Sequence, residues 1–178
     1  MDSEVYRLWE IAGSAHTNAF WAPQMFEIMQ RDFGIPIPEC EGHFNAVPSQ
    51  YVMNAAISHL ARWVRDDFLP PAFPPLDVVG KPATLVKDKF GNSAGGIRLP
   101  EITVPIALYE TGGDSRCPAE SGYTTLFSHE ILSAEYPTHE DYVSKYTKAV
   151  QSAVESGFLL PADANEAIKK AQSAQIPE

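Results

Sequence analysis

The sequence is poor in cysteine and in basic residues, and it has no apolar run of the ~20 residues that a membrane helix needs. Its 178 residues include only two cysteines, Cys40 and Cys117, too few for a disulfide-rich scaffold. Both lie in loop-like segments, so we expect free thiols, although one bridge would form if the fold brought them together. Lys and Arg number 13 against 23 Asp and Glu, and the net charge of -10 argues against nucleic acid or an anionic membrane as a partner.

Targeting and metal-binding patterns are also missing. The first residues, MDSEVYR, are acidic and lack the basic start and apolar core of a signal peptide, which predicts a cytoplasmic protein. The chain has no HxH, HExxH or CxxC pattern, no cluster of carboxylates and no Gly-rich strand-to-helix loop for phosphate. The sequence therefore predicts neither a metal ion nor a cofactor.

What the sequence does contain is the composition of an ordinary globular domain. With 44% hydrophobic and 20% charged residues, residues 1–178 fit one domain. Short β-prone runs predict a strand at 5–11 and a hairpin that pairs 83–87 with 97–99. Periodicity and capping residues predict helices at 18–33, 49–68, 138–156 and 161–174. We therefore expect an α+β domain that is mainly helical, with a short N-terminal strand and a β-hairpin.

The strongest helical pattern, from Ser49 to Phe68, is expected to form the central element of the core. Its apolar residues keep the i, i+3, i+4 spacing, and we expect Leu60 and Trp63 to be buried. His59 lies on the same stripe. A core histidine with one hydrogen-bond partner is favoured there over a ligand.

The stretch WEIAGSAHTNAF, residues 9–20, contains the sharpest candidate for a functional residue. It reads as the end of an apolar strand, a turn of small residues, then His16 and a helix with Thr17 as a candidate N-cap. Open α/β sheets place their ligands at the carboxyl ends of strands, where this histidine would lie. Imidazole is suited to proton transfer near neutral pH, so His16 is a candidate acid or base. The plainer interpretation is a loop histidine that caps a helix or satisfies a carbonyl.

This stretch resembles the final catalytic strand and histidine loop of a little-characterised family of the α/β-hydrolase superfamily. The resemblance continues through PSQYVMNAAISHLARWVRDDFLPPAFPPL, GNSAGGIRLPEITVPIALY and GFLLPADANEAI, so it covers nearly the whole chain. It implies that His16 occupies the position of the triad base. It also implies a truncated relative of the α/β-hydrolase fold, because the part with most of the sheet, the nucleophile elbow and the triad acid has no counterpart here.

Residues 91–95, GNSAG, match the nucleophile-elbow pattern G-x-S-x-G literally, but their context predicts a hairpin turn. An elbow requires an apolar strand before the serine and a helix after it, and neither flank has that character. Ser93 also follows His16, whereas the nucleophile precedes the histidine in α/β-hydrolases. We therefore expect that Ser93 is not a nucleophile.

Three functions from different classes follow. The first is a stand-alone, non-hydrolytic enzyme, a cyclase, isomerase or lyase, that acts on a small apolar metabolite by acid/base catalysis in a histidine-lined pocket. Its proton-transfer groups would be His16 with His43, Tyr51 or Asp114. The second is a hydrolase fragment or subunit whose serine and acid come from another chain. The third is a non-catalytic binding module.

The predicted N-terminal strand also bears on assembly. In the resembling enzymes this strand belongs to a large sheet, and here that sheet is missing. Exposed apolar strand edges invite pairing. The sequence therefore suggests a homodimer joined through residues 5–11.

Overall fold

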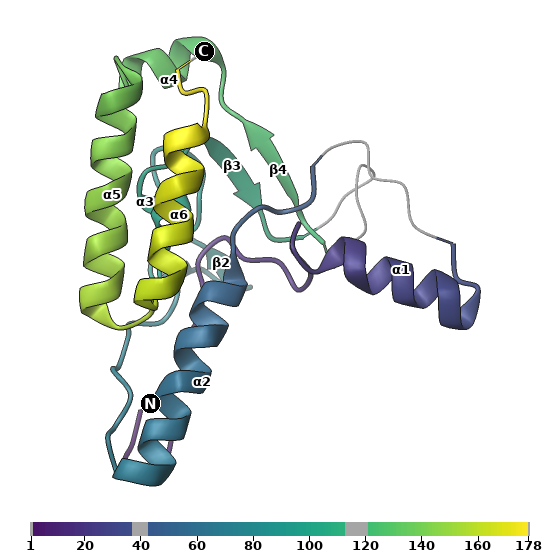
Figure 1. Cartoon of the computed structure of the whole chain (residues 1–178), viewed down its shortest axis with the longest axis vertical. Helices are drawn as coiled ribbons and strands as arrows, with labels where there is room; N and C mark the ends of the chain where they lie inside the picture. Colours follow the sequence, from purple (N-terminus) through teal and green to yellow (C-terminus); the bar gives the residue numbers. More distant parts are fainter. Residues whose placement is uncertain (1, 37–42, 113–120, 178) are drawn as a thin grey trace.

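The computed structural model describes residues 2–36, 43–112 and 121–177. Within these ranges the helices and strands follow one another as α1 Ala22–Phe33, α2 Ser49–Asp66, β1 Val78–Val79, β2 Thr84–Leu85, α3 Pro100–Thr103, β3 Ala107–Glu110, β4 Tyr123–Leu126, α4 His129–Glu135, α5 His139–Ser156 and α6 Pro161–Ser173 (Figure 1). No described helix is both long enough and apolar enough to span a membrane.

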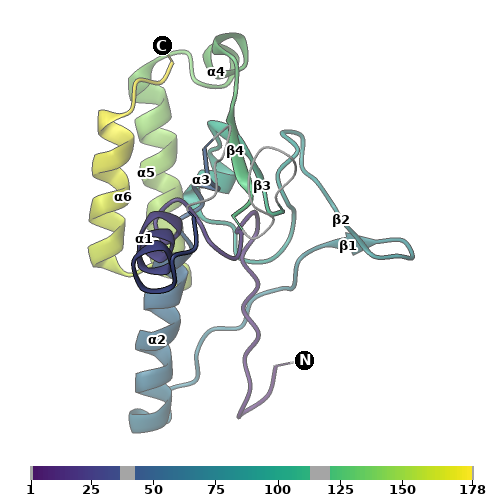
Figure 2. The same ribbon diagram turned by 90° about the vertical axis from the view of Figure 1, so that its right-hand side faces the viewer.

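The described strands form two small antiparallel sheets. β1 pairs with β2, and β3 pairs with β4 with Ala107 opposite Leu126. Figure 2 shows the β1–β2 ribbon projecting to one side, away from the helices. The predicted class, a mainly helical α+β fold, is confirmed.

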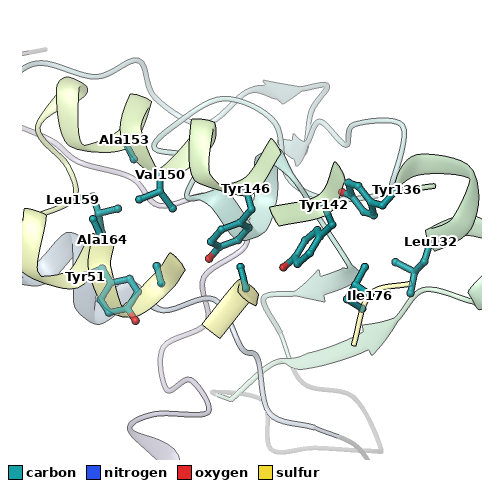
Figure 3. Close-up of a cluster of buried hydrophobic side chains, with 12 residues drawn as sticks. Tyr51, Leu132, Tyr136, Tyr142, Tyr146, Val150, Ala153, Leu159, Ala164 and Ile176 are labelled. Atoms are coloured by element: carbon teal, nitrogen blue, oxygen red, sulfur yellow. The ribbon is translucent and has the colours of Figure 1, made fainter. Parts of the chain in front are cut away.

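The main core lies between α5 and α6, which run side by side as a helical hairpin (Figure 1). α5 contributes a row of tyrosines, and Figure 3 shows Tyr142 and Tyr146 on the helix face that also carries Val150. α6 contributes alanines at 164, 167 and 171, and small residues let the helices approach closely. The large side chains of one helix thus lie against the small side chains of the other.

Local capping signals in the sequence fix several helix ends. Thr138 caps α5 by accepting a hydrogen bond from the backbone N–H of Asp141, and Gly157 ends it in the left-handed conformation. Pro161 begins α6, where a missing N–H is harmless. Gly34 ends α1 as predicted, but Thr17 is not its N-cap, because α1 begins only at Ala22.

The prediction that the 49–68 helix is the central core element is wrong for most of its length. Tyr51, Val52 and Ala55 near its start are buried, whereas Leu60 is 55% exposed and Val64 is 80% exposed. The lower half of α2 extends past the end of the α5–α6 hairpin (Figure 1), and the segments beside it there are the N-terminal segment and the chain that follows α2, which share a pocket with Leu60. The amphipathic pattern predicted the helix correctly but could not predict what covers its apolar face.

Residues 5–11 do not form the predicted strand. Their regular pairing is reduced to isolated bridges, Ser3 with Tyr6 and Ile11 with Ile97. Val5 is 86% exposed, because the structure provides no sheet beneath this run. An apolar run becomes a strand only where a neighbouring strand satisfies its backbone groups.

The predicted hairpin exists at its turn but has a different partner strand. Lys87 bridges Ser93 across a tight turn, as expected. Thr84 and Leu85 pair with Val79 and Val78, however, and not with 97–99. Ile97 is unavailable because its backbone bonds to the N-terminal segment.

Candidate functional site

A single parallel bridge positions the His16 loop. The Ile97 N–H donates to the Glu10 carbonyl at 2.7 Å, and the Ala12 N–H donates to the Ile97 carbonyl at 2.9 Å. The chain then turns at Gly13, whose φ is +70°, and a Cβ there would lie 2.6 Å from Ile102 Cδ1. Only glycine fits both the backbone angle and the space.

Asn45 holds this turn in place. Its Nδ2 donates to the Gly13 carbonyl at 2.7 Å and to the Glu110 carbonyl of β3 at 3.0 Å. Its backbone carbonyl accepts from the Ala19 N–H at 2.7 Å, on the far side of the histidine. The side chain is fully buried, so Asn45 replaces the pairing that a larger sheet would provide.

A second buried amide fixes the other end of the loop. Asn18 Nδ2 donates to the Val47 carbonyl at 2.9 Å and to Ser49 Oγ at 3.0 Å. The Asn18 Oδ1 accepts from the Phe20 N–H at 3.0 Å, which prepares the entry to α1. Thr17 Oγ1 lies 3.1 Å from Ser121 Oγ.

His16 therefore stands on a well-held backbone with an exposed side chain. Ala15 and Thr17 on either side of it are buried, while His16 is exposed. Its ring makes no hydrogen bond with the described residues, so it caps no helix and satisfies no carbonyl there. A rigid backbone with a free imidazole suits proton transfer to a group that approaches from outside.

The other predicted site residues are placed differently. The His43 carbonyl accepts from the Thr124 N–H at 2.8 Å beside β4, and the His43 side chain is exposed. His43 precedes Asn45 by two positions, so its segment is tied to the His16 loop. Tyr51 is buried in the α5–α6 core, where Lys170 Nζ donates to its hydroxyl at 3.1 Å and burial raises its pKa (Figure 3). Asp114, Cys40 and Cys117 lie outside the described residues.

His59 has the structural role expected of it. Its Nε2 lies 2.8 Å from the Gly157 carbonyl at the end of α5. Its ring centroid lies 5.7 Å from that of Trp9 in an edge-on arrangement. His59 thus links α2 to the α5–α6 turn.

The GNSAG segment serves to attach a turn to β3. Asn92 Nδ2 donates to the Ala107 carbonyl at 3.0 Å, and Asn92 Oδ1 accepts from the Tyr109 N–H at 2.9 Å. Ser93 is fully buried, and its Oγ has no hydrogen-bond partner among the described residues. A hydroxyl with neither a base nor solvent beside it cannot act as a nucleophile, so the hairpin interpretation is correct.

Sequence reasoning missed one buried carboxyl, that of Glu101 in α3. Tyr146 donates its hydroxyl hydrogen to Glu101 Oε1 at 2.7 Å, and Oε2 is buried without a partner among the described residues. Burial raises the pKa of this carboxyl, against the opposing effect of the Tyr146 hydrogen bond. A lone glutamate in LPEITV has no periodic or motif signal, so only the fold reveals it.

Within the described ranges, no three His, Cys, Asp or Glu side chains gather as a metal site would require. No curated protein and no solved structure matches the chain. The sequence model of a family described as "alpha/beta hydrolase domain" matches residues 1–169. The histidine loop of this chain and the parallel bridge that positions it are consistent with this family match. Because the match spans most of its length, the chain belongs to the α/β hydrolase domain family.

Proposed function

We propose that this chain supplies the histidine of a hydrolase active site whose serine and acid come from another polypeptide segment. Membership of the α/β hydrolase domain family supports the chemistry. The exposed ring of His16 on a backbone held by Asn45 supports its role as the base. Ser93 is buried and cannot supply the nucleophile.

The observation that carries the proposal is the free edge beside His16. In this parallel bridge Ile97 bonds through its own N–H and carbonyl, so the N–H and carbonyl of Ile11 point away from Ile97. Ile11 makes no backbone hydrogen bond of its own within the described residues. A strand of another segment can pair there in parallel, and the carboxyl end of such a strand would lie next to His16.

Exposed apolar residues on the N-terminal segment and on α2 support the same conclusion. Val5 and Leu8 precede Ile11, and both are exposed. Leu60 and Val64 on the lower half of α2 are exposed as well. Water-exposed apolar surface of this kind marks contact sites, and a missing part of the fold would cover it.

The test compares the 178-residue chain with the same chain joined to, or co-expressed with, the polypeptide encoded immediately upstream. Turnover of p-nitrophenyl acetate is measured for parent, His16→Ala and His43→Ala proteins, the last being a control on a second exposed histidine. We expect turnover only in the completed assembly. His16→Ala should lower it by about 10⁴–10⁶-fold, as removal of a triad member does, whereas His43→Ala should leave it nearly unchanged.

Two outcomes would overturn the proposal. One is ester turnover by the 178-residue chain alone that His16→Ala abolishes, since the chain would then need no second segment. The other is a completed hydrolase that is indifferent to His16→Ala.

A second copy of this chain at the Ile11 edge would appear as a dimer by light scattering. Ile11→Pro should abolish that dimer because proline lacks the N–H.

A second function is favoured by one further observation, the apolar cavity beside Glu101. In this alternative the chain is a stand-alone cyclase, isomerase or lyase that acts on a small apolar molecule by acid/base catalysis. His16 is not among the residues that line this cavity, so the acid or base there would be Glu101, and Glu101→Gln would reduce turnover by about 10²–10⁴-fold in the single chain, the usual contribution of general acid/base help. If neither assembly nor single chain turns over a substrate, the chain is a non-catalytic binding module.

A further inference from the structure

We propose that the exposed apolar face of α2 binds an amphipathic helix whose apolar side is flanked by lysine or arginine. That helix belongs to the segment that supplies the serine and acid, and for its origin the inference rests on the proposed function. The test measures binding alone, so the docking site and the proposed function can fail separately.

Four apolar side chains form a seam along the exposed face of α2. Each of them is more than half exposed, and they are Met53, Ile57, Leu60 and Val64. They follow one another at spacings of four, three and four residues, the a and d spacing of a coiled coil. Side chains at this spacing interlock with those of a second helix. The seam therefore indicates a helical partner.

The C-terminal end of this seam borders a groove that can receive a partner side chain. The groove lies between the N-terminal segment and the last turns of α2, and its volume is about 380 Å³. Its apolar walls are Val5, Leu60, Trp63 and Val64. A helix that lies on the seam can therefore anchor an apolar side chain in the groove, as helices do in other grooves of this kind.

The charges at this groove favour a basic partner. Two charged residues line it, Glu4 and Asp67, and both are acidic. Neither forms an ion pair with another described residue. A second copy of the chain would bring the same acidic side chains to the contact, where like charges repel. A helix with lysine or arginine beside its apolar face would meet the opposite charge instead.

Basic side chains on α2 and on the N-terminal segment leave these two carboxylates available. Arg65 pairs with Asp66 at 2.8 Å. Arg62 lies over an aromatic ring at 3.9 Å from its centroid. Arg7 donates to the Pro70 carbonyl at 2.9 Å. The acidic groups at the groove can therefore pair with a partner.

The experiment measures the binding of two labelled synthetic peptides to the 178-residue chain by fluorescence anisotropy at low salt. Both peptides have about 20 residues, long enough to form a helix, with leucine at the a and d positions. They differ only in having lysine or glutamate at the e and g positions. The lysine peptide should bind about 5–30-fold more tightly, because two modest attractions replace two repulsions. Added salt should bring this ratio toward one.

Variants with a matched control locate the binding. Leu60→Gln should weaken binding of the lysine peptide by about tenfold or more, because it places an amide in the apolar seam. Leu126→Gln on β4 is the control, since Leu126 is 60% exposed against 55% for Leu60, and it should leave binding unchanged. Asp67→Asn should lower the preference for lysine about two- to fivefold. Asparagine also adopts the left-handed conformation that Asp67 has.

Equal binding of the two peptides would overturn the proposal. So would binding that survives Leu60→Gln, binding that Leu126→Gln weakens as much, or no binding of either peptide up to about 1 mM. A dimer of the chain that light scattering detects and Leu60→Gln dissolves would also overturn it, because a second copy would then occupy the seam. Circular dichroism should confirm that each variant is folded. If the lysine peptide binds but the completed assembly turns over no ester, the docking site stands and the proposed function fails.

Discussion

Substitutions at two leucines can distinguish the observed core from the core that the sequence pattern predicts. Leu159, between α5 and α6, is 2% exposed, whereas Leu60 on α2 is 55% exposed. Leu159→Ala and Leu60→Ala remove the same atoms from these two environments. The pair therefore tests the placement of the core with the chemistry held constant.

The magnitudes follow from the burial. Each buried methylene-sized group contributes about 0.8 kcal/mol, so the carbons removed at Leu159 account for roughly 2.4 kcal/mol. The unfilled space adds to this, giving a loss of about 2–5 kcal/mol in the free energy of unfolding. At Leu60 about half of the side chain is already in water and no closed space is left behind, so the loss should be about 1 kcal/mol or less.

Thermal unfolding followed by circular dichroism measures the difference. A change of 1 kcal/mol shifts the melting temperature of a chain of this size by about 2–4 °C. Leu159→Ala should therefore melt about 4–20 °C lower than the parent, and Leu60→Ala no more than about 4 °C lower. If the two variants melt together, or if Leu60→Ala is the less stable, the core is not where the structure places it.

Three further predictions address single polar side chains. Ser93→Ala should melt at or slightly above the parent temperature, and fluorophosphonate should label neither protein, because the buried Ser93 Oγ has no hydrogen bond to lose; labelling of Ser93 would contradict this. Asn45→Ala should lower the free energy of unfolding, measured in urea, by about 2–3 kcal/mol, because the Gly13 and Glu110 carbonyls lose a buried donor. A loss below about 0.5 kcal/mol, the usual effect of a surface substitution, would show that Asn45 does not hold the turn. Glu101→Gln should melt at a higher temperature than the parent at pH 7 and at the same temperature at pH 4. Burial raises the pKa of the Glu101 carboxyl above its ordinary value of 4.5, so only the parent loses stability as the pH rises past that value. A difference in melting temperature that grows toward pH 4 would show that the pKa is lowered instead.

Sequence reasoning succeeded where structure is decided locally. Thr138, Gly157 and Pro161 mark helix ends because caps act within one turn. The hairpin turn before Ser93 was predictable for the same reason.

It failed where a distant partner decides the outcome. The strand at 5–11 needed a neighbour that the structure does not provide, and the apolar face of α2 needed a cover. Asn45 and Glu101 were missed because single polar residues acquire their importance only from the groups that the fold brings to them. For the candidate site, the turn of small residues before His16 was predictable, but the amides that hold its loop were not.

The turn at Gly157 also has a consequence for the order of folding. It joins α5 and α6, neighbours in sequence, so this hairpin closes with little loss of chain entropy. The bonds of Asn45 instead join residues 32 and 65 positions apart, and such contacts form late. Synthesis runs the other way, since the His16 loop leaves the ribosome first. The nascent N-terminal half therefore folds only after the C-terminal hairpin has formed. Pulse-labelled hydrogen exchange should find α5 and α6 protected before residues 12–19.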